Sequence, residues 1–122
     1  MSRVVHFELP VDDPDRAVNF YRSVFGWQIK KWEGPMDYWL ITTGKQGEMG
    51  IDGALTRRSE GFMNTVNTVG VESLDESIAR VEANGGKILM PKEHIPGVGW
   101  LAYAQDTEGN NFGIIQPDPM PS

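Results

Sequence analysis

The sequence predicts an α+β fold in which two tandem βαβββ modules form a cupped mixed sheet. The first observation is a weak internal repeat, because sliding the chain by 60 positions aligns Val11 with Val71, Gly26 with Gly86 and Gly53 with Gly113. The second is that each half reads as a strand, a capped helix, a glycine stop and three further strands. We therefore expect one domain over residues 1–122, with module 1 at about 1–58 and module 2 at about 62–118.

The first module opens with an alternating segment over residues 4–9, in which apolar residues flank His6 and Glu8. This period of two predicts a half-buried strand. Asp13 and Pro14 then have the residue types of an N-cap and a first helical position. An amphipathic helix should follow and end at Gly26, with its apolar stripe at Ala17, Phe20, Tyr21 and Val24. Further strands are expected near residues 27–32, 38–43 and 50–56.

The second module repeats this order. Residues 65–71 should form its first strand, and Ser73 with Glu76 resembles a capping box at the start of a helix. Gly85 and Gly86 mark the helix end. The remaining strands are expected near residues 87–90, 99–104 and 111–116, with a linker at 57–63 and a loose tail at 117–122.

Composition excludes several classes of function. The net charge of −6 and the absence of a basic run argue against nucleic acid as a partner. The absence of cysteine excludes disulfides, thiolate nucleophiles and Cys-ligated zinc. No apolar stretch approaches the roughly 20 residues that span a bilayer, and no secretory signal is visible, so we expect no membrane partner and a cytoplasmic location.

Several short motifs occur in a characteristic order. His6 is followed by Val11, by Asp15-Arg16-Ala17 and Phe20-Tyr21, and by Phe25-Gly26-Trp27, while residues 106–110 read Asp-Thr-Glu-Gly-Asn before the last strand. This combination resembles the vicinal-oxygen-chelate family, which includes glyoxalase I, bleomycin-resistance proteins and extradiol dioxygenases. The resemblance covers residues 6–116 and implies a homodimer with a small-molecule cavity between its half-sheets.

The resemblance also implies positions for a divalent metal, held by up to four side chains. Those positions fall on His6, Gly53, Val66 and Gly113, and only His6 has a donor atom. Because a catalytic metal takes about three protein ligands, we expect that the shared metal site is lost and predict no cofactor. Asp52 or Thr68 could replace a donor only after a register adjustment, and Gln116 would lie on the opposite strand face.

The candidate site residues each have two interpretations. His6 and Glu8 share a strand face, and they form either an acid–base or ligand-anchoring pair or a hydrogen-bonded structural pair. Trp39 and Trp100, with Tyr38 and Tyr103, form either an aromatic pocket wall or core and dimer packing. Gly53 and Gly113 would leave the cavity wall without bulky side chains. Phe62 either covers the edge of the cavity or only precedes the next strand. His94 is expected in a loop, where it is either solvated or at the entrance of the pocket. The acidic residues 12–15 suggest calcium binding or, more simply, helix capping.

Three function hypotheses follow. The preferred one is a metal-independent protein that binds an apolar or aromatic small molecule through His6, Glu8, Trp39, Gly53, Phe62, Trp100 and Gly113. The alternative is an enzyme, either a metal-dependent lyase, isomerase or dioxygenase of glyoxalase type or a metal-free enzyme that uses His6 or Glu8 as its base. The third is an interaction module. The sequence leaves open whether the chain is catalytic and which ligand it takes.

Overall fold

The computed structural model describes residues 2–34 and 36–119, which form two compact units. One unit is His6–Val66, and the other joins residues 2–5 to residues 67–119. In chain order the elements are β1 (Arg3–Val11), α1 (Pro14–Phe25), β2 (Gln28–Lys31), β3 (Tyr38–Thr42), β4 (Asp52–Arg57), β5 (Val66–Gly70), α2 (Leu74–Ala83), β6 (Lys87–Ile95), β7 (Gly99–Gln105) and β8 (Asn111–Pro117). This order confirms the predicted α+β fold with its repeated βαβββ pattern, whereas the predicted module boundaries stay a prediction.

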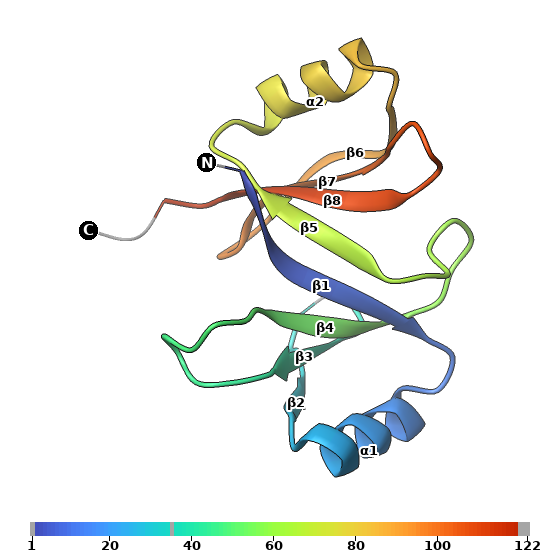
Figure 1. The fold of residues 1–122 in the computed structure, drawn as a ribbon, viewed down its shortest axis with the longest axis vertical. Helices are drawn as coiled ribbons and strands as arrows, with labels where there is room; N and C mark the ends of the chain where they lie inside the picture. The colour runs from blue at the N-terminus through green and yellow to red at the C-terminus, as the bar shows by residue number, and fades with distance from the viewer. Residues whose placement is uncertain (1, 35, 120–122) are drawn as a thin grey trace. The chain divides into compact units, whose positions relative to one another are not determined.

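In the unit His6–Val66 the strand order is β2-β3-β4-β1 (Figure 1). β1 runs parallel to β4, and the other neighbours are antiparallel. One face of this sheet packs against α1 around a buried core of Val18, Ile29, Trp39, Ile41 and Leu55. The odd-numbered residues Phe7, Leu9 and Val11 of β1 pack on this core, as the period of two predicted.

In the second unit the order is β5-β8-β7-β6, with β5 parallel to β8 (Figure 1). Leu74 at the start of α2 packs on one face of this sheet with Ala102, Ala104 and Ile114. Each of these four residues is at most 2% exposed, so the cluster is shielded from solvent. Each unit therefore has a helix-covered face and an opposite face, and strand alternation decides which side chains belong to each.

Both helix starts confirm the predicted caps. The Asp13 side chain accepts a hydrogen bond from the backbone N–H of Arg16 at 3.1 Å, ahead of Pro14. Ser73 accepts from the backbone N–H of Glu76 at 3.2 Å. Gly26 ends α1 with φ of 70°, a left-handed conformation that favours glycine.

The sequence-based prediction for β6 was wrong at its C-terminal end. We expected this strand to stop at Met90 and placed His94 in a loop, but β6 continues to Ile95, and His94 pairs with Trp100 of β7. The pairing register shifts on both sides of Met90, next to Pro91. Such irregularities let a strand contain a proline that donates no hydrogen bond, so Pro91 interrupts the pattern without ending the strand. β8 likewise extends to Pro117, which we had assigned to the tail.

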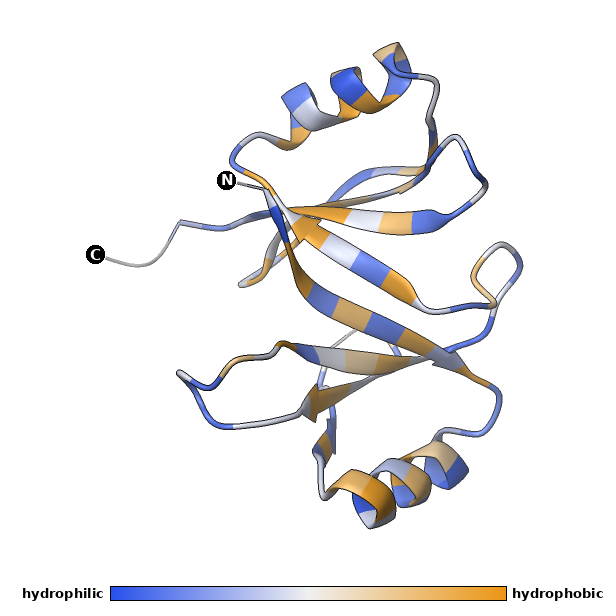
Figure 2. Ribbon diagram, viewed as in Figure 1, coloured by the Kyte–Doolittle hydropathy of each residue, from blue (hydrophilic) through white to orange (hydrophobic). Residues whose placement is uncertain are grey.

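Hydropathy follows the same alternation in space. Figure 2 shows hydrophobic and hydrophilic residues alternating along β1 and separate stripes on both helices. In residues 2–34 and 36–119, no helix combines the length and apolar character that crossing a membrane requires.

Candidate functional site

The face of the first unit's sheet opposite α1 carries a group of polar side chains, here called the polar cluster: His6, Glu8, Tyr38 and Asp52. In the parallel register His6 pairs with Asp52 and Glu8 pairs with Ala54. Paired residues of neighbouring strands point to the same side of a sheet, so His6, Glu8 and Asp52 share one face. Tyr38 of β3 reaches the same face, because its hydroxyl donates a hydrogen bond to Oε1 of Glu8 at 3.3 Å.

Glu8 is a buried carboxylate and only 7% exposed. A carboxylate in such a place needs hydrogen-bond donors, since burial without partners is costly. The Tyr38 hydroxyl supplies one of them. The structural interpretation predicted from the sequence paired Glu8 with His6, whereas this hydrogen bond joins Glu8 to Tyr38 of β3.

His6 is half-buried, and its imidazole is kept neutral by its surroundings. Burial lowers the pKa of His6 below its ordinary value of 6.5, while the nearby charge of Asp52 acts in the opposite direction. Asp52 is exposed, and its Oδ1 accepts from the backbone N–H of Thr43 at 2.8 Å and from the Thr43 hydroxyl at 3.3 Å. A neutral imidazole beside a carboxylate that is fixed by hydrogen bonds can accept a proton, or it can accept a hydrogen bond from a ligand.

Gly53 does not lie where we placed it. We assigned it to the family's second ligand position on the cavity side, but a Cβ there would lie 2.4 Å from the Phe7 carbonyl oxygen and 2.6 Å from the Phe7 ring. Gly53 therefore belongs to the face that packs against α1, and a side chain there would collide with the core. The residue beside His6 is Asp52, one position earlier, and strand pairing rather than sequence offset reveals it.

The two equivalent ligand positions of the second half are Val66 and Gly113. Val66 is 1% exposed on β5. Gly113 of β8 pairs with Thr68, and a Cβ on Gly113 would lie 2.7 Å from the Thr68 hydroxyl. Gln116 is engaged elsewhere, because its Oε1 accepts from the backbone N–H of Leu74 at 2.8 Å. This contact confirms that Gln116 points to the α2 side, away from the face of Gly113.

These positions do not fit the metal centre that the fold family implies. Within residues 2–34 and 36–119, no group of three or more His, Cys, Asp or Glu side chains is arranged to hold an ion. His6, Glu8 and Asp52 carry donor atoms on the first unit's sheet, with Glu8 already bonded to Tyr38, whereas Gly113 supplies none. These side chains do not form the arrangement of about three protein ligands that a catalytic zinc or similar ion takes, so we derive no step through a metal.

Two of the predicted aromatic residues are buried. Trp39 is 9% exposed in the α1 core cluster, with Lys31 Nζ and the Arg57 guanidinium each 5.4 Å from its ring. Tyr103 of β7 is 8% exposed. For Trp39 this is the arrangement that the core-packing interpretation describes, on the face opposite the polar cluster.

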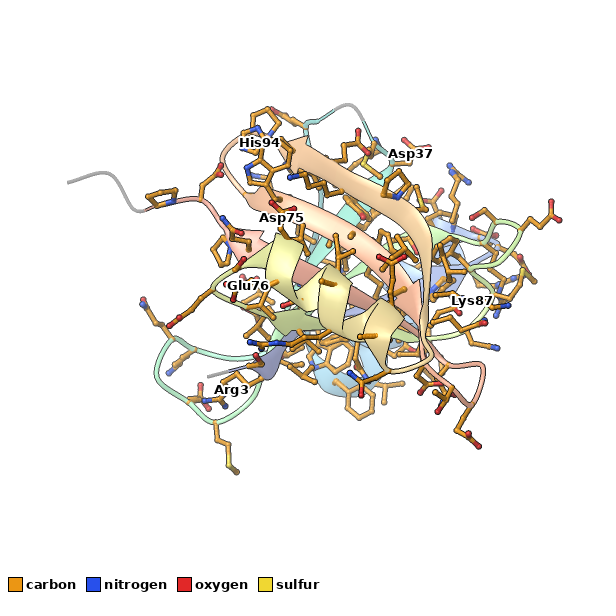
Figure 3. All side chains as sticks on the ribbon, turned by 90° about the horizontal axis from the view of Figure 1, so that it is seen from above. Arg3, Asp37, Asp75, Glu76, Lys87 and His94 are labelled. Carbon is orange, nitrogen blue, oxygen red and sulfur yellow. The ribbon has the colours of Figure 1, made fainter. Side chains whose placement is uncertain are left out.

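Trp100 is 38% exposed and lies in a small surface group with His94 and Lys92. The His94 ring lies 4.8 Å from the Trp100 ring, and Lys92 Nζ lies 5.3 Å from it. His94 Nε2 also lies 2.9 Å from an Asp118 carboxylate oxygen, and Lys92 Nζ donates to Asp75 at 2.9 Å. Figure 3 shows His94 toward the β6–β7 turn and Asp75 on the first turn of α2.

Phe62 lies in a short turn of the linker. Its backbone N–H donates to the Ser59 carbonyl at 2.8 Å. Arg58 anchors the same segment, with an ion pair to Asp12 at 2.7 Å and a hydrogen bond to the Met63 carbonyl at 3.3 Å. Asp12 and Asp13 are thus used in this ion pair and in the α1 cap, which matches the capping interpretation of the acidic run.

The Asp-Thr-Glu-Gly-Asn segment forms the β7–β8 turn. Asp106 Oδ1 accepts from the backbone N–H groups of Glu108 at 2.8 Å and Asn110 at 2.9 Å. These hydrogen bonds, with the one from the Asn110 side chain, lower the pKa of Asp106. Gly109 takes φ of 84°. The family-like motif therefore has a structural role at this turn.

Residues 3–44 match the family model described as bleomycin resistance protein-like N-terminal. With the repeated βαβββ fold and the comparisons below, this match makes the chain similar to the vicinal-oxygen-chelate superfamily of glyoxalase and bleomycin-resistance-like proteins. It is 29% identical over 116 residues to "Putative glyoxylase CFP32" of Mycobacterium tuberculosis, covering 93% of this chain and 43% of that protein. It is also 29% identical over 124 residues to a glyoxylase-like domain-containing protein of Didymella fabae, covering 93% of this chain and 92% of that protein.

Solved structures share the fold at low identity. Hypothetical protein BH1468 from Bacillus halodurans is 13% identical with a TM-score of 0.75, over 99% of this chain and 98% of that one. Methylmalonyl-CoA epimerase from Mycobacterium tuberculosis is 14% identical with a TM-score of 0.68, over 95% of this chain and 88% of that one. The chain therefore resembles glyoxalase-like proteins in fold and sequence, and it spans less than half the length of the mycobacterial CFP32 that it matches.

Proposed function

We propose that this chain is a glyoxalase-like protein that binds an apolar or aromatic small molecule without the superfamily's metal. The observation that carries the proposal is the set of side chains at the family's metal-ligand positions. The family positions hold an imidazole at His6, an isopropyl group at Val66 and a bare backbone at Gly113, while Gly53 is turned into the α1 core. Pockets for small molecules are mostly apolar with a few placed polar groups, and such residues suit that description better than ion coordination.

The polar cluster supplies the orienting groups of this proposal. A neutral His6 offers one donor and one acceptor, and the exposed Asp52 beside it offers acceptors. Glu8 is held by Tyr38 and adds carboxyl oxygens that can accept hydrogen bonds from a ligand. Neutral or weakly basic aromatic compounds are therefore the preferred ligand class.

Two measurements test the proposal together. Metal analysis of the purified protein should find less than about 0.1 equivalent of iron, manganese, nickel or zinc per chain, against about one for a loaded site. A thermal-shift panel of aromatic and matched aliphatic compounds should raise the melting temperature with the aromatic set, because a ligand at 100 times its Kd stabilises by about 2.7 kcal/mol. A stoichiometric metal, or a panel without any shift, would overturn the proposal.

A second candidate function is metal-free proton transfer by the polar cluster. The specific observation in its favour is His6, which burial keeps neutral next to a carboxylate, as a general base requires. The epimerase relative suggests a probe: loss of the α-proton of methylmalonyl-CoA in heavy water, followed by NMR. Exchange that H6Q abolishes and E8Q retains would support this candidate, and exchange at the rate of buffer alone would exclude it for this substrate.

We further propose that the chain works as a homodimer. The mycobacterial relative is more than twice as long, since the chain covers 43% of it, so two copies of this chain would approach its length. Sedimentation equilibrium should give about twice the chain mass of 13.6 kDa. A single monomeric species at micromolar concentration would contradict this proposal.

A further inference from the structure

Thr68 has a buried hydroxyl whose hydrogen bond is missing. It lies on β5 and is only 2% exposed. Across the part of the chain that the structure describes, its Oγ1 is the buried side-chain nitrogen or oxygen atom without a hydrogen-bond partner. Buried polar groups in native proteins are almost always hydrogen-bonded, and an exception calls for an explanation such as a water or a ligand.

The neighbour of this hydroxyl is a glycine. Thr68 pairs with Gly113 of β8 in the parallel register, and a Cβ on Gly113 would lie 2.7 Å from Oγ1 and 3.3 Å from the Thr68 methyl group. Any larger residue at this position would press on the hydroxyl. The Thr68 hydroxyl therefore lies directly over the Gly113 backbone, in the place that a side chain at residue 113 would take.

The strand beyond Gly113 adds an aromatic ring. Gly113 pairs with Tyr103 of β7, which is 8% exposed. A hydroxyl, a bare backbone and a phenol ring therefore lie in one row across β5, β8 and β7. The next paired row contributes Leu101 and Ile115, so the row has apolar neighbours.

This row faces away from α2. Ile114 and Ala102, the residues that alternate with Gly113 and Tyr103, pack in the α2 core. Alternation along each strand then sends Thr68, Gly113 and Tyr103 to the opposite face of the sheet. The hydroxyl is consequently separate from the core that stabilises this unit, so its lack of a partner is not a packing compromise in that core.

We propose that Thr68 Oγ1 is the anchor for the hydroxyl or carbonyl oxygen of a flat, uncharged ligand whose apolar body lies over Gly113 beside Tyr103. A threonine hydroxyl both donates and accepts, so it recognises either group. The row itself carries no charged side chain, which favours a neutral ligand. This inference rests on the proposed small-molecule function and names the polar group that the ligand must carry.

The test compares 2-naphthol with naphthalene, which has the same ring system without the hydroxyl. Affinities are measured by ligand fluorescence for the wild type, Thr68→Val, Thr68→Ser and Gly113→Ala. We expect Thr68→Val to weaken 2-naphthol binding about three- to tenfold while naphthalene changes less than about twofold. Thr68→Ser should retain the preference for 2-naphthol, and Gly113→Ala should weaken both ligands.

Thr68→Val should also keep or raise the melting temperature of the ligand-free protein, because it removes an unpartnered hydroxyl at nearly constant volume. A lower melting temperature would mean that the hydroxyl is satisfied by the protein in solution, and this result would overturn the inference. Equal weakening of both ligands by Thr68→Val, or weakening of neither, would also overturn it while the small-molecule function stands. Failure of the wild type to bind either compound would reject the anchor, and the thermal-shift panel then decides the proposed function separately.

Discussion

Asp52 lies beside His6 in the parallel register of β1 and β4, so a carboxylate and an imidazole share the sheet face opposite α1. Burial lowers the pKa of His6, and the Asp52 charge partly offsets that effect. The charge state of His6 is therefore set by two opposing causes that mutation can separate.

Removing the carboxylate should lower the His6 pKa further. In Asp52→Asn the charge that favours the imidazolium is gone, while the larger effect, burial, remains. The His6 ring protons, followed by NMR through a pH titration, should shift their midpoint to lower pH than in the wild type. Asp118→Asn removes a carboxylate from the other unit and serves as the matched control; an equal shift in both variants would contradict the assignment to Asp52.

Stability should fall as the solution is acidified below the ordinary histidine pKa. The folded His6 has a lowered pKa, so below about pH 6.5 the unfolded chain binds a proton that the folded chain resists. This loss of stability is absent above the ordinary histidine pKa. It grows as the pH falls toward the pKa of His6 in the folded chain, and it levels off below that pKa. Urea unfolding at roughly pH 7.5 and roughly pH 5.5 should show a larger loss for the wild type than for His6→Gln, which lacks the titrating group. Identical losses would show that His6 is not desolvated.

Gly53→Ala should be strongly destabilising, by about 2 kcal/mol or more, because the new methyl group meets the Phe7 carbonyl and ring at 2.4 and 2.6 Å. The control is Gly44→Ala, where a Cβ makes only an ordinary 3.6 Å contact with Glu48. Denaturant midpoints of both variants check the prediction. Tolerance of Gly53→Ala would mean that Gly53 faces open space, as a metal-ligand position on the cavity side would.

Tyr38→Phe should destabilise the protein by about 1 kcal/mol, because the buried Glu8 carboxylate loses the hydroxyl that donates to it at 3.3 Å. Glu8→Gln should reduce the effect of Tyr38→Phe, since a neutral amide needs its donors less than a carboxylate does. A double-mutant cycle of urea unfolding measures this coupling. Tyr21→Phe keeps the ring stacked on Trp27 at 5.1 Å and should be nearly neutral, whereas equal costs for both tyrosines would argue against a Glu8-specific role.

Local chemistry made much of the fold predictable. Asp13, Ser73 and Gly26 have residue types that begin or end helices wherever they occur, so the caps could be inferred from their neighbours alone. The end of β6 was not predictable in this way. Register shifts on both sides of Met90, next to Pro91, let pairing continue as far as Ile95, and such shifts depend on the partner strand.

The amino-acid order alone determined the repeated βαβββ pattern, the α1-facing positions of β1, and His6 and Glu8 as two polar residues on one face, because these follow from periods within a single segment. Tertiary structure decided that Asp52 rather than Gly53 lies beside His6, that Tyr38 bonds to Glu8, and that Gly113 lies beside an unpartnered Thr68 hydroxyl. Each of these contacts depends on the register between strands that are distant in the chain. A slip of one residue reverses every side chain of a strand, and only the packed sheet selects the register.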